Sequence, residues 1–112
     1  MLIIEMDSMD ILQVNQEITI KNVEQFKVNL ESLLESTQKR YLILDLEKVT
    51  YLNSSALGCI ADTAMKAKKV NKELVVAGIK PPIDEIFHIV KFEFFMELFK
   101  SKEEAVEYFS SK

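Results

Sequence analysis

The chain has 112 residues, of which 48% are hydrophobic and 29% are charged, and its formal net charge is −4. This length and composition are typical of a globular protein with one hydrophobic core, so we expect a single domain over residues 1–112. The negative charge, with lysines and arginines scattered along the chain, argues against a nucleic-acid-binding protein, because such a protein needs a basic surface for phosphates.

The sequence also bears on location and cofactors. The first ten residues, MLIIEMDSMD, lack the basic region of a secretory signal, and no apolar run approaches the roughly 18 residues that span a membrane. We therefore expect a cytoplasmic protein without a membrane partner. Cys59 is the single cysteine, which excludes an intrachain disulfide and a zinc site built on two cysteines. We expect neither a metal ion nor another cofactor.

The chain opens with two short apolar or alternating segments, residues 2–6 and 11–15, separated by the turn-forming sequence DSMD. This pattern predicts a hairpin. Residues 17–21 alternate again, so two or three strands are expected before the first helix. Asn22 is expected to cap that helix. Its apolar face is formed by Val23, Phe26, Leu30, Leu33 and Leu34.

Strands and helices then alternate. Residues 41–44 and 74–77 are near-continuous apolar runs, which predict strands buried on both faces. A helix is expected between them, starting at Ser54, with inward positions at Leu57, Ile60, Ala61 and Ala64. Pro81-Pro82 predicts the start of a third helix. Residues 94–99 predict a last strand, and residues 102–109 predict a last helix.

This order of elements predicts an α/β fold with a mixed sheet of about five strands and about four helices, the later strands being parallel. We expect the helices to cover mainly one face of the sheet. In open sheets of this kind, binding sites form beyond the carboxyl ends of the parallel strands. The sequence YLNSSALG, residues 51–58, lies at such an end. It is therefore the first candidate for a functional site.

The two serines of this sequence have two interpretations. Asn and Ser are the residues that most often cap a helix, so Asn53, Ser54 and Ser55 would serve only to start one. This interpretation is favoured if the helix start is considered alone. In either interpretation, we expect that Ser54 can cap the helix in its unmodified state. The second interpretation is that another protein acts on the serine pair.

The outer face of the same helix carries small or polar residues, which are Ser55, Gly58, Cys59 and Asp62. A solvated face and a docking face fit this composition about equally well. Gly58 favours docking slightly, because a glycine inside a helix costs up to about 1 kcal/mol and usually has a packing or docking reason.

The segment LDLEKVTYLNSSALGCI resembles the signature of STAS domains, and specifically of bacterial anti-sigma factor antagonists. The element order agrees over nearly the whole chain. The resemblance implies a regulatory switch that is not an enzyme. The unmodified form would bind an anti-sigma factor that is also a serine protein kinase, and would thereby free a sigma factor. Phosphorylation of Ser54 would end this binding, and a serine phosphatase would restore it. With the outer helix face, the expected partner-binding residues are Asn53, Ser54, Ser55, Gly58, Cys59 and Asp62.

The chain departs from the usual family pattern at four positions. Asn53 replaces an aspartate, Ala56 replaces a glycine, Thr19 stands where an acid is common, and Lys91 stands where many members have glycine. These residues would alter kinase recognition or loop geometry, and they leave the acceptor serine in place.

Two alternatives remain open. The first is a STAS scaffold that is never phosphorylated and holds a partner, or a second copy of itself as a homodimer, through the second helix and the phenylalanine-rich end. Six of the seven phenylalanines follow residue 86, and most are expected in the core: Phe87, Phe92, Phe94, Phe95, Phe99 and Phe109. The second alternative is a small-ligand sensor with a pocket near the strand ends.

Overall fold

The computed structural model describes residues 1–36, 38–94 and 96–112. It confirms an α/β fold with four α-helices and one short 3-10 helix among these residues. In chain order the elements are β1 (Leu2–Glu5), β2 (Met9–Gln13), α1 (Val23–Glu35), β3 (Tyr41–Asp45), α2 (Ser54–Lys69), β4 (Glu73–Ala77), α3 (Asp84–Ile89), η1 (Phe92–Phe94) and α4 (Lys102–Ser110).

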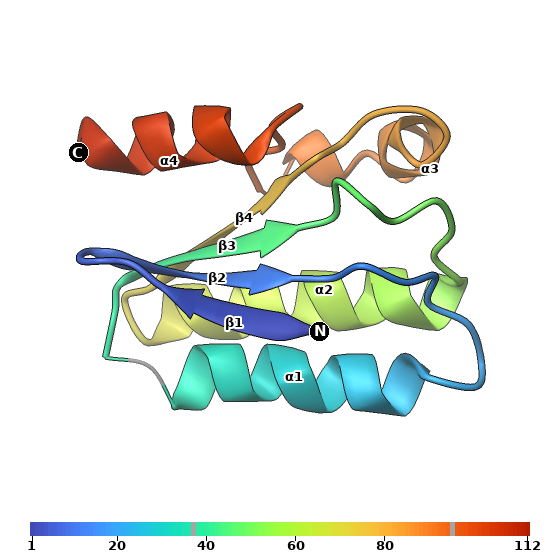
Figure 1. The fold of residues 1–112 in the computed structure, drawn as a ribbon, viewed down its shortest axis with the longest axis horizontal. Coiled ribbons are helices and arrows are strands. Elements are labelled where there is room, and N and C mark those ends of the chain that lie inside the picture. The colour runs from blue at the N-terminus through green and yellow to red at the C-terminus, as the bar shows by residue number, and fades with distance from the viewer. Residues whose placement is uncertain (37, 95) are drawn as a thin grey trace.

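The sheet has the order β1-β2-β3-β4 (Figure 1). The hairpin of β1 and β2 is antiparallel, and β2, β3 and β4 are parallel to one another, as predicted. Helices α1 and α2 make the two crossovers between the parallel strands. As a result, the carboxyl ends of β2 and β3 and the first turns of α1 and α2 lie at one end of the molecule (Figure 1).

Residues 94–99, predicted as a last strand, did not form one, and neither did residues 17–21, the possible third strand before the first helix. In the part of the chain that the structure describes, residues 17–21 contribute only an isolated bridge between Ile18 and Leu52, and residues 94–99 contribute only one between Val76 and Leu98. Phe94 belongs to η1, and Phe95 lies outside the described residues. Residues 94–99 do not form a fifth strand, because their pairing with β4 is confined to Val76. The N–H of Val76 donates to the carbonyl of Glu97, and the carbonyl of Val76 accepts from the N–H of Phe99. The sheet therefore has four strands where about five were expected.

Helices cover both faces of the sheet. Helices α1 and α2 lie on one face, and α4 lies on the other (Figure 1). The first face carries the larger core, which includes Leu44 and Val76 as well as Phe87 of α3. On the second face, Ile43 and Val75 pack with Phe109 of α4. The expectation of mainly one-sided cover is therefore wrong for α4. The reason is that β3 and β4 are apolar on both faces, as predicted, and each face needs a covering element.

The phenylalanine-rich end is mostly core, as expected. Phe87, Phe92 and Phe109 are buried and Phe99 is half-buried, whereas Phe94 is 77% exposed. Among the described residues, no helix combines the length and the apolar character needed to cross a membrane.

Asn22 differs from its predicted role. It occupies the residue before α1, but its side chain makes no hydrogen bond to that helix. Instead, its Oδ1 accepts from the backbone N–H of Thr19 at 2.8 Å, and its Nδ2 donates to the carbonyl of Glu17 at 2.8 Å. Asn22 therefore folds the loop between β2 and α1 into a tight turn, which explains why residues 17–21 do not continue as a strand.

Candidate functional site

The loop between β3 and α2 is anchored to the segment that follows β4. The N–H of Leu46 donates to the carbonyl of Ala77 at 2.9 Å. Next to it, Gly78 has φ of +79°, and a Cβ built on it would lie 2.3 Å from the backbone nitrogen of Glu47. Only glycine fits this backbone conformation and this close approach. Gly78 therefore allows the loop that leads to Ser54 to lie directly against the chain leaving β4.

The same loop is joined on its other side to the loop between β2 and α1. The N–H of Ile18 donates to the carbonyl of Tyr51 at 3.0 Å, and the N–H of Asn53 donates to the carbonyl of Ile18 at 3.1 Å. The hydroxyl of Thr50 donates to the Glu17 carboxylate at 3.1 Å. These three hydrogen bonds fix the two loops side by side and place Asn53 immediately before α2.

Helix α2 is capped by Asn53 and not by Ser54, so the predicted cap is wrong by one residue. Asn53 has extended backbone dihedrals, and its Oδ1 accepts from the N–H of Ala56 at 2.8 Å. Ser54 is the first helical residue, and its hydroxyl is not used as the cap. Ser54 and Ser55 are both exposed, and neither hydroxyl has a hydrogen-bond partner within the described residues. The Ser54 hydroxyl is thus free for chemistry while the helix keeps its cap.

The start of α2 is also electrostatically suited to a negative group. Of its first N–H groups, that of Ala56 donates to the Asn53 side chain and that of Leu57 donates to the Asn53 carbonyl. The N–H groups of Ser54 and Ser55 have no protein acceptor in the described part of the chain. The first turn contains no acidic residue. The positive end of the helix dipole is therefore unopposed by charge within its own first turn.

Three of the predicted docking residues share one exposed face of α2: Ser55, Gly58 and Asp62. A Cβ built on Gly58 would meet nothing within 4 Å, so packing inside this chain does not require a glycine there. Asp62 forms an exposed ion pair with Lys66 at 3.0 Å. The hydrogen bond to Asp62 is the main cause of the raised pKa of the Lys66 ammonium group.

Cys59 lies on the flank of α2 that faces α1. It is half-buried and packs against the larger core, beside a small groove that Lys27 and Glu31 of α1 also line. Burial raises the pKa of its thiol, which keeps the thiol protonated at neutral pH. Cys59 therefore lies at the border of the exposed face that holds Ser55 and Gly58, on the side toward α1.

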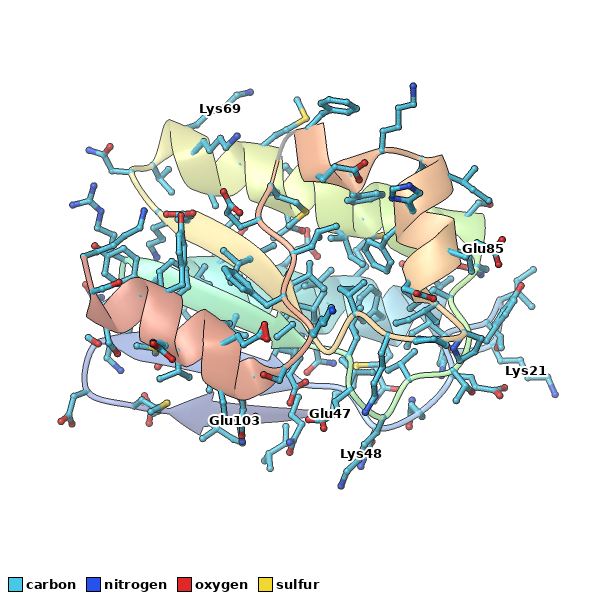
Figure 2. The ribbon with its side chains drawn as sticks, turned by 90° about the horizontal axis from the view of Figure 1, so that it is seen from above. Lys21, Glu47, Lys48, Lys69, Glu85 and Glu103 are labelled. Atoms are coloured by element: carbon cyan, nitrogen blue, oxygen red, sulfur yellow. The ribbon has the colours of Figure 1, made fainter. Side chains whose placement is uncertain are left out.

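Two exposed apolar residues near Ser54 were not singled out from the sequence. Ile20 is 87% exposed and Tyr51 is 46% exposed, and each belongs to one of the two loops joined by hydrogen bonds. The alternation of residues 17–21 predicted that Ile20 and Ile18 lie on the same side of a strand. Because the turn made by Asn22 replaces this strand, Ile18 is buried whereas Ile20 is exposed. Figure 2 shows the neighbouring Lys21 projecting at this end of the molecule, far from Lys69 at the end of α2.

An open groove of about 880 Å³ lies past the carboxyl end of β4, between α3 and residues 98–100. Its apolar part includes Ile79, Leu98 and Phe99, and its polar part includes Asp84 and His88. Ser54 is not among the lining residues. The groove and the serine site are therefore separate features of the strand-end region.

Comparison with known proteins identifies the family. The model of the STAS domain matches residues 3–105. A protein of Bordetella bronchiseptica, BtrV, whose name describes it as an anti-sigma factor antagonist, is 27% identical over 107 residues, which are 96% of this chain and 91% of that protein. The structure of an anti-sigma factor antagonist from Mycobacterium paratuberculosis superposes with a TM-score of 0.87 at 20% identity, covering 96% of this chain and 90% of that one. The unphosphorylated form of the anti-sigma factor antagonist SpoIIAA gives a TM-score of 0.81 at 14% identity, covering 99% and 96%. The chain therefore belongs to the STAS domain family.

Proposed function

We propose that this protein is an anti-sigma factor antagonist whose binding to an anti-sigma factor is switched by phosphorylation of Ser54. In this proposal the anti-sigma factor is also a serine protein kinase, and a serine phosphatase removes the phosphate. The protein itself acts as a binding module and not as an enzyme. The relatives named as anti-sigma factor antagonists support the general role.

The observation that carries the proposal is the division of labour between Asn53 and Ser54. Asn53 caps α2, so the exposed Ser54 hydroxyl is not needed to hold the helix. A phosphate on Ser54 would add a charge of about −1.5 to −2 beside the free N–H groups of Ser54 and Ser55 and the positive end of the helix dipole. The fold can therefore tolerate the modification while the charge and size of the surface change.

The same geometry explains how phosphorylation could end binding. The proposed docking surface consists of the start of α2, its exposed face with Ser55, Gly58 and Asp62, and the apolar side chains of Ile20 and Tyr51 in the adjoining loops. A partner packed against this surface would exclude water from the Ser54 hydroxyl. A phosphate there would have to be desolvated on binding, and the N–H groups and dipole of the helix start would offset only part of its charge, so binding would be unfavourable.

The proposal is tested with protein that carries genetically encoded phosphoserine at position 54. The anti-sigma factor is first isolated from a lysate of cells that naturally produce this protein, with the unmodified protein as bait, and is then purified. We expect phosphoserine at position 54 to weaken binding by at least tenfold, whereas phosphoserine at position 55, as the matched control, weakens it less. Equal binding of the unmodified protein and the protein phosphorylated at Ser54 would contradict the switch and favour a scaffold that is never phosphorylated.

The groove beside α3 gives the second candidate function, a small-ligand sensor. Its volume of about 880 Å³ lies within the range of ligand pockets, and it has an apolar part with polar groups at its sides. A thermal-shift screen of small molecules that combine an apolar body with one positively or negatively charged group tests this function. A ligand whose stabilising effect is abolished by Leu98→Trp, which fills the groove, would support the sensor.

A further inference from the structure

Strand β1 forms an edge of the sheet that no described element covers. It pairs with β2 on one side and with no other strand among the described residues. Its apolar side chains are unusually accessible, since Leu2 is 59% exposed, Ile3 is 38% exposed and Met6, just after the strand, is 39% exposed. The opposite edge differs, because the bridge between Val76 and Leu98 partly covers β4. β1 also lacks proline and lysine, two residues that commonly protect an edge strand against pairing.

The register of the hairpin shows which backbone groups of β1 face outward. The N–H of Met6 donates to the carbonyl of Met9 at 2.9 Å, so these residues form a hydrogen-bonded pair. Hydrogen-bonded and non-hydrogen-bonded pairs alternate along an antiparallel ladder. Ile4 and Leu2 therefore use their N–H and carbonyl groups toward β2, whereas those of Ile3 and Glu5 point away from the sheet.

We propose that β1 pairs with β1 of a second copy of this chain, antiparallel and about a two-fold axis that passes beside Ile4. Ile3 of each copy then lies opposite Glu5 of the other, and each such pair exchanges two hydrogen bonds. Leu2 lies opposite Met6, and Ile4 lies opposite Ile4. The two four-stranded sheets become one continuous sheet.

This register is selected by both hydrogen bonding and charge. It satisfies all four outward-facing groups of β1 in each copy. It also separates the two Glu5 carboxylates, whereas an axis at Glu5 would place them directly opposite each other, which is destabilising. Ile4 packs against the core that contains Met9 and Ile11, so an Ile4 pair extends this apolar layer across the axis.

A second copy fits this edge better than an unrelated partner, because the edge is complementary to itself. On one face of the sheet, Leu2, Ile4 and Met6 form an apolar row. In the proposed pairing this row lies beside Met6, Ile4 and Leu2 of the second copy. The pairing involves one short strand per copy, so its buried area lies below that of a permanent dimer. The dimer should therefore be weak and depend on protein concentration. The inference does not rest on the proposed function, since it involves neither Ser54 nor α2.

Disulfide trapping tests the register in a Cys59→Ser background. Directly opposed residues of a non-hydrogen-bonded pair have Cα atoms about 4.5 Å apart, a distance that allows a disulfide. We expect Ile4→Cys to form a covalent dimer by itself under mild oxidation. Leu2→Cys alone should not, but a mixture of Leu2→Cys and Met6→Cys proteins should cross-link. Cross-linking of Ile4→Cys no faster than that of Leu2→Cys alone would overturn the proposed register.

Sedimentation velocity of the full chain tests the association itself. The apparent mass should rise from 12.9 kDa toward about twice that value as the concentration increases. Ile3→Pro removes an outward-facing N–H that β2 does not use, so the variant should keep the unmodified protein's circular dichroism spectrum and remain at the monomer mass. Val28→Ser, on the exposed side of α1, is the control and should dimerise normally. A parent protein that stays at 12.9 kDa up to millimolar concentration would overturn the proposal.

Discussion

The side-chain oxygen of Asn53 lies 2.8 Å from the backbone nitrogen of Ala56 and caps the helix that Ser54 begins. This relationship assigns different tasks to two adjacent residues. Asn53 stabilises the helix, and the Ser54 hydroxyl remains exposed. The stability of α2 and the chemistry of Ser54 can therefore be changed separately by mutation.

The first prediction separates these two tasks. Asn53→Ala removes the hydrogen bond to the N–H of Ala56 and should lower the free energy of unfolding by about 1 kcal/mol. Ser54→Ala should change it by less than about 0.5 kcal/mol, because an exposed side chain without a partner is lost. Urea unfolding of both variants and the parent measures the difference. Equal losses in the two variants would show that Ser54 shares the capping role.

The second prediction concerns Asn53, which stands where the resemblance to anti-sigma factor antagonists leads us to expect aspartate. Asn53→Asp keeps an oxygen that can cap the helix, so the unmodified protein should remain as stable as the parent. With phosphoserine at position 54, the aspartate places a second negative charge close to the phosphate. Two unit charges 4 Å apart repel by about 4 kcal/mol at an effective dielectric constant near 20, a phosphate carries more than one unit charge, and solvent at an exposed site reduces the repulsion well below these values.

Melting temperatures of the modified and unmodified forms of both proteins measure this effect. Phosphorylation should lower the melting temperature by several degrees more in Asn53→Asp than in the parent. The same shift in both proteins would rule out the electrostatic explanation for Asn53.

The third prediction compares the two glycines of the chain. Gly58→Ala should stabilise the protein by up to about 1 kcal/mol, because alanine favours the helix and its Cβ meets no atom within 4 Å. If the exposed face of α2 docks a partner closely, the same variant should bind the anti-sigma factor more weakly. A binding affinity equal to that of the parent would show that Gly58 is not needed for docking.

Gly78→Ala should have the opposite effect on stability. Its φ of +79° disfavours alanine, and the new Cβ would collide with the backbone of Glu47. A loss of more than about 2 kcal/mol is expected, because neither backbone segment can move away without breaking the hydrogen bond between Leu46 and Ala77. Urea unfolding, with Gly58→Ala as the comparison, checks the sign and size of both effects.

The fourth prediction concerns Lys91, which stands where the resemblance leads us to expect glycine. It has φ of +57°, in the left-handed region that is unfavourable for lysine. Lys91→Gly should raise the free energy of unfolding by up to about 1 kcal/mol, whereas Lys91→Ala, which keeps a Cβ, should not. If Lys91→Gly does not raise the free energy of unfolding, contacts of α3 and η1 already offset the cost of the positive φ at Lys91.

Much of the fold could be predicted because it depends on local apolar patterns. The runs that became β3 and β4 and the helical spacing of Leu57, Ile60 and Ala64 indicated the parallel strands and a covered sheet. The two failed strands depended on tertiary detail. Asn22 turns residues 17–21 away from the sheet through its own side chain, and η1 leaves only residues near Leu98 beside β4.

The candidate site shows the same limit. The sequence placed Ser54 at a helix start near a strand end, and the structure locates it there. It did not show which of two adjacent polar residues caps the helix, because Asn53 and Ser54 are both good caps and only backbone dihedrals distinguish them. Nor could it show that Ile20 lies in a loop hydrogen-bonded to the one that precedes Ser54, because that contact joins segments more than 30 residues apart.

The most direct test of the central claim is phosphate transfer to the protein by a serine kinase of the anti-sigma factor class that binds it. After incubation with this kinase and ATP, intact-mass and peptide mass spectrometry should find one phosphate, on Ser54, and none on the Ser54→Ala protein. The phosphorylated protein should then dissociate from the kinase. A phosphate only on Ser55, or no phosphate despite demonstrated binding, would contradict the switch at Ser54.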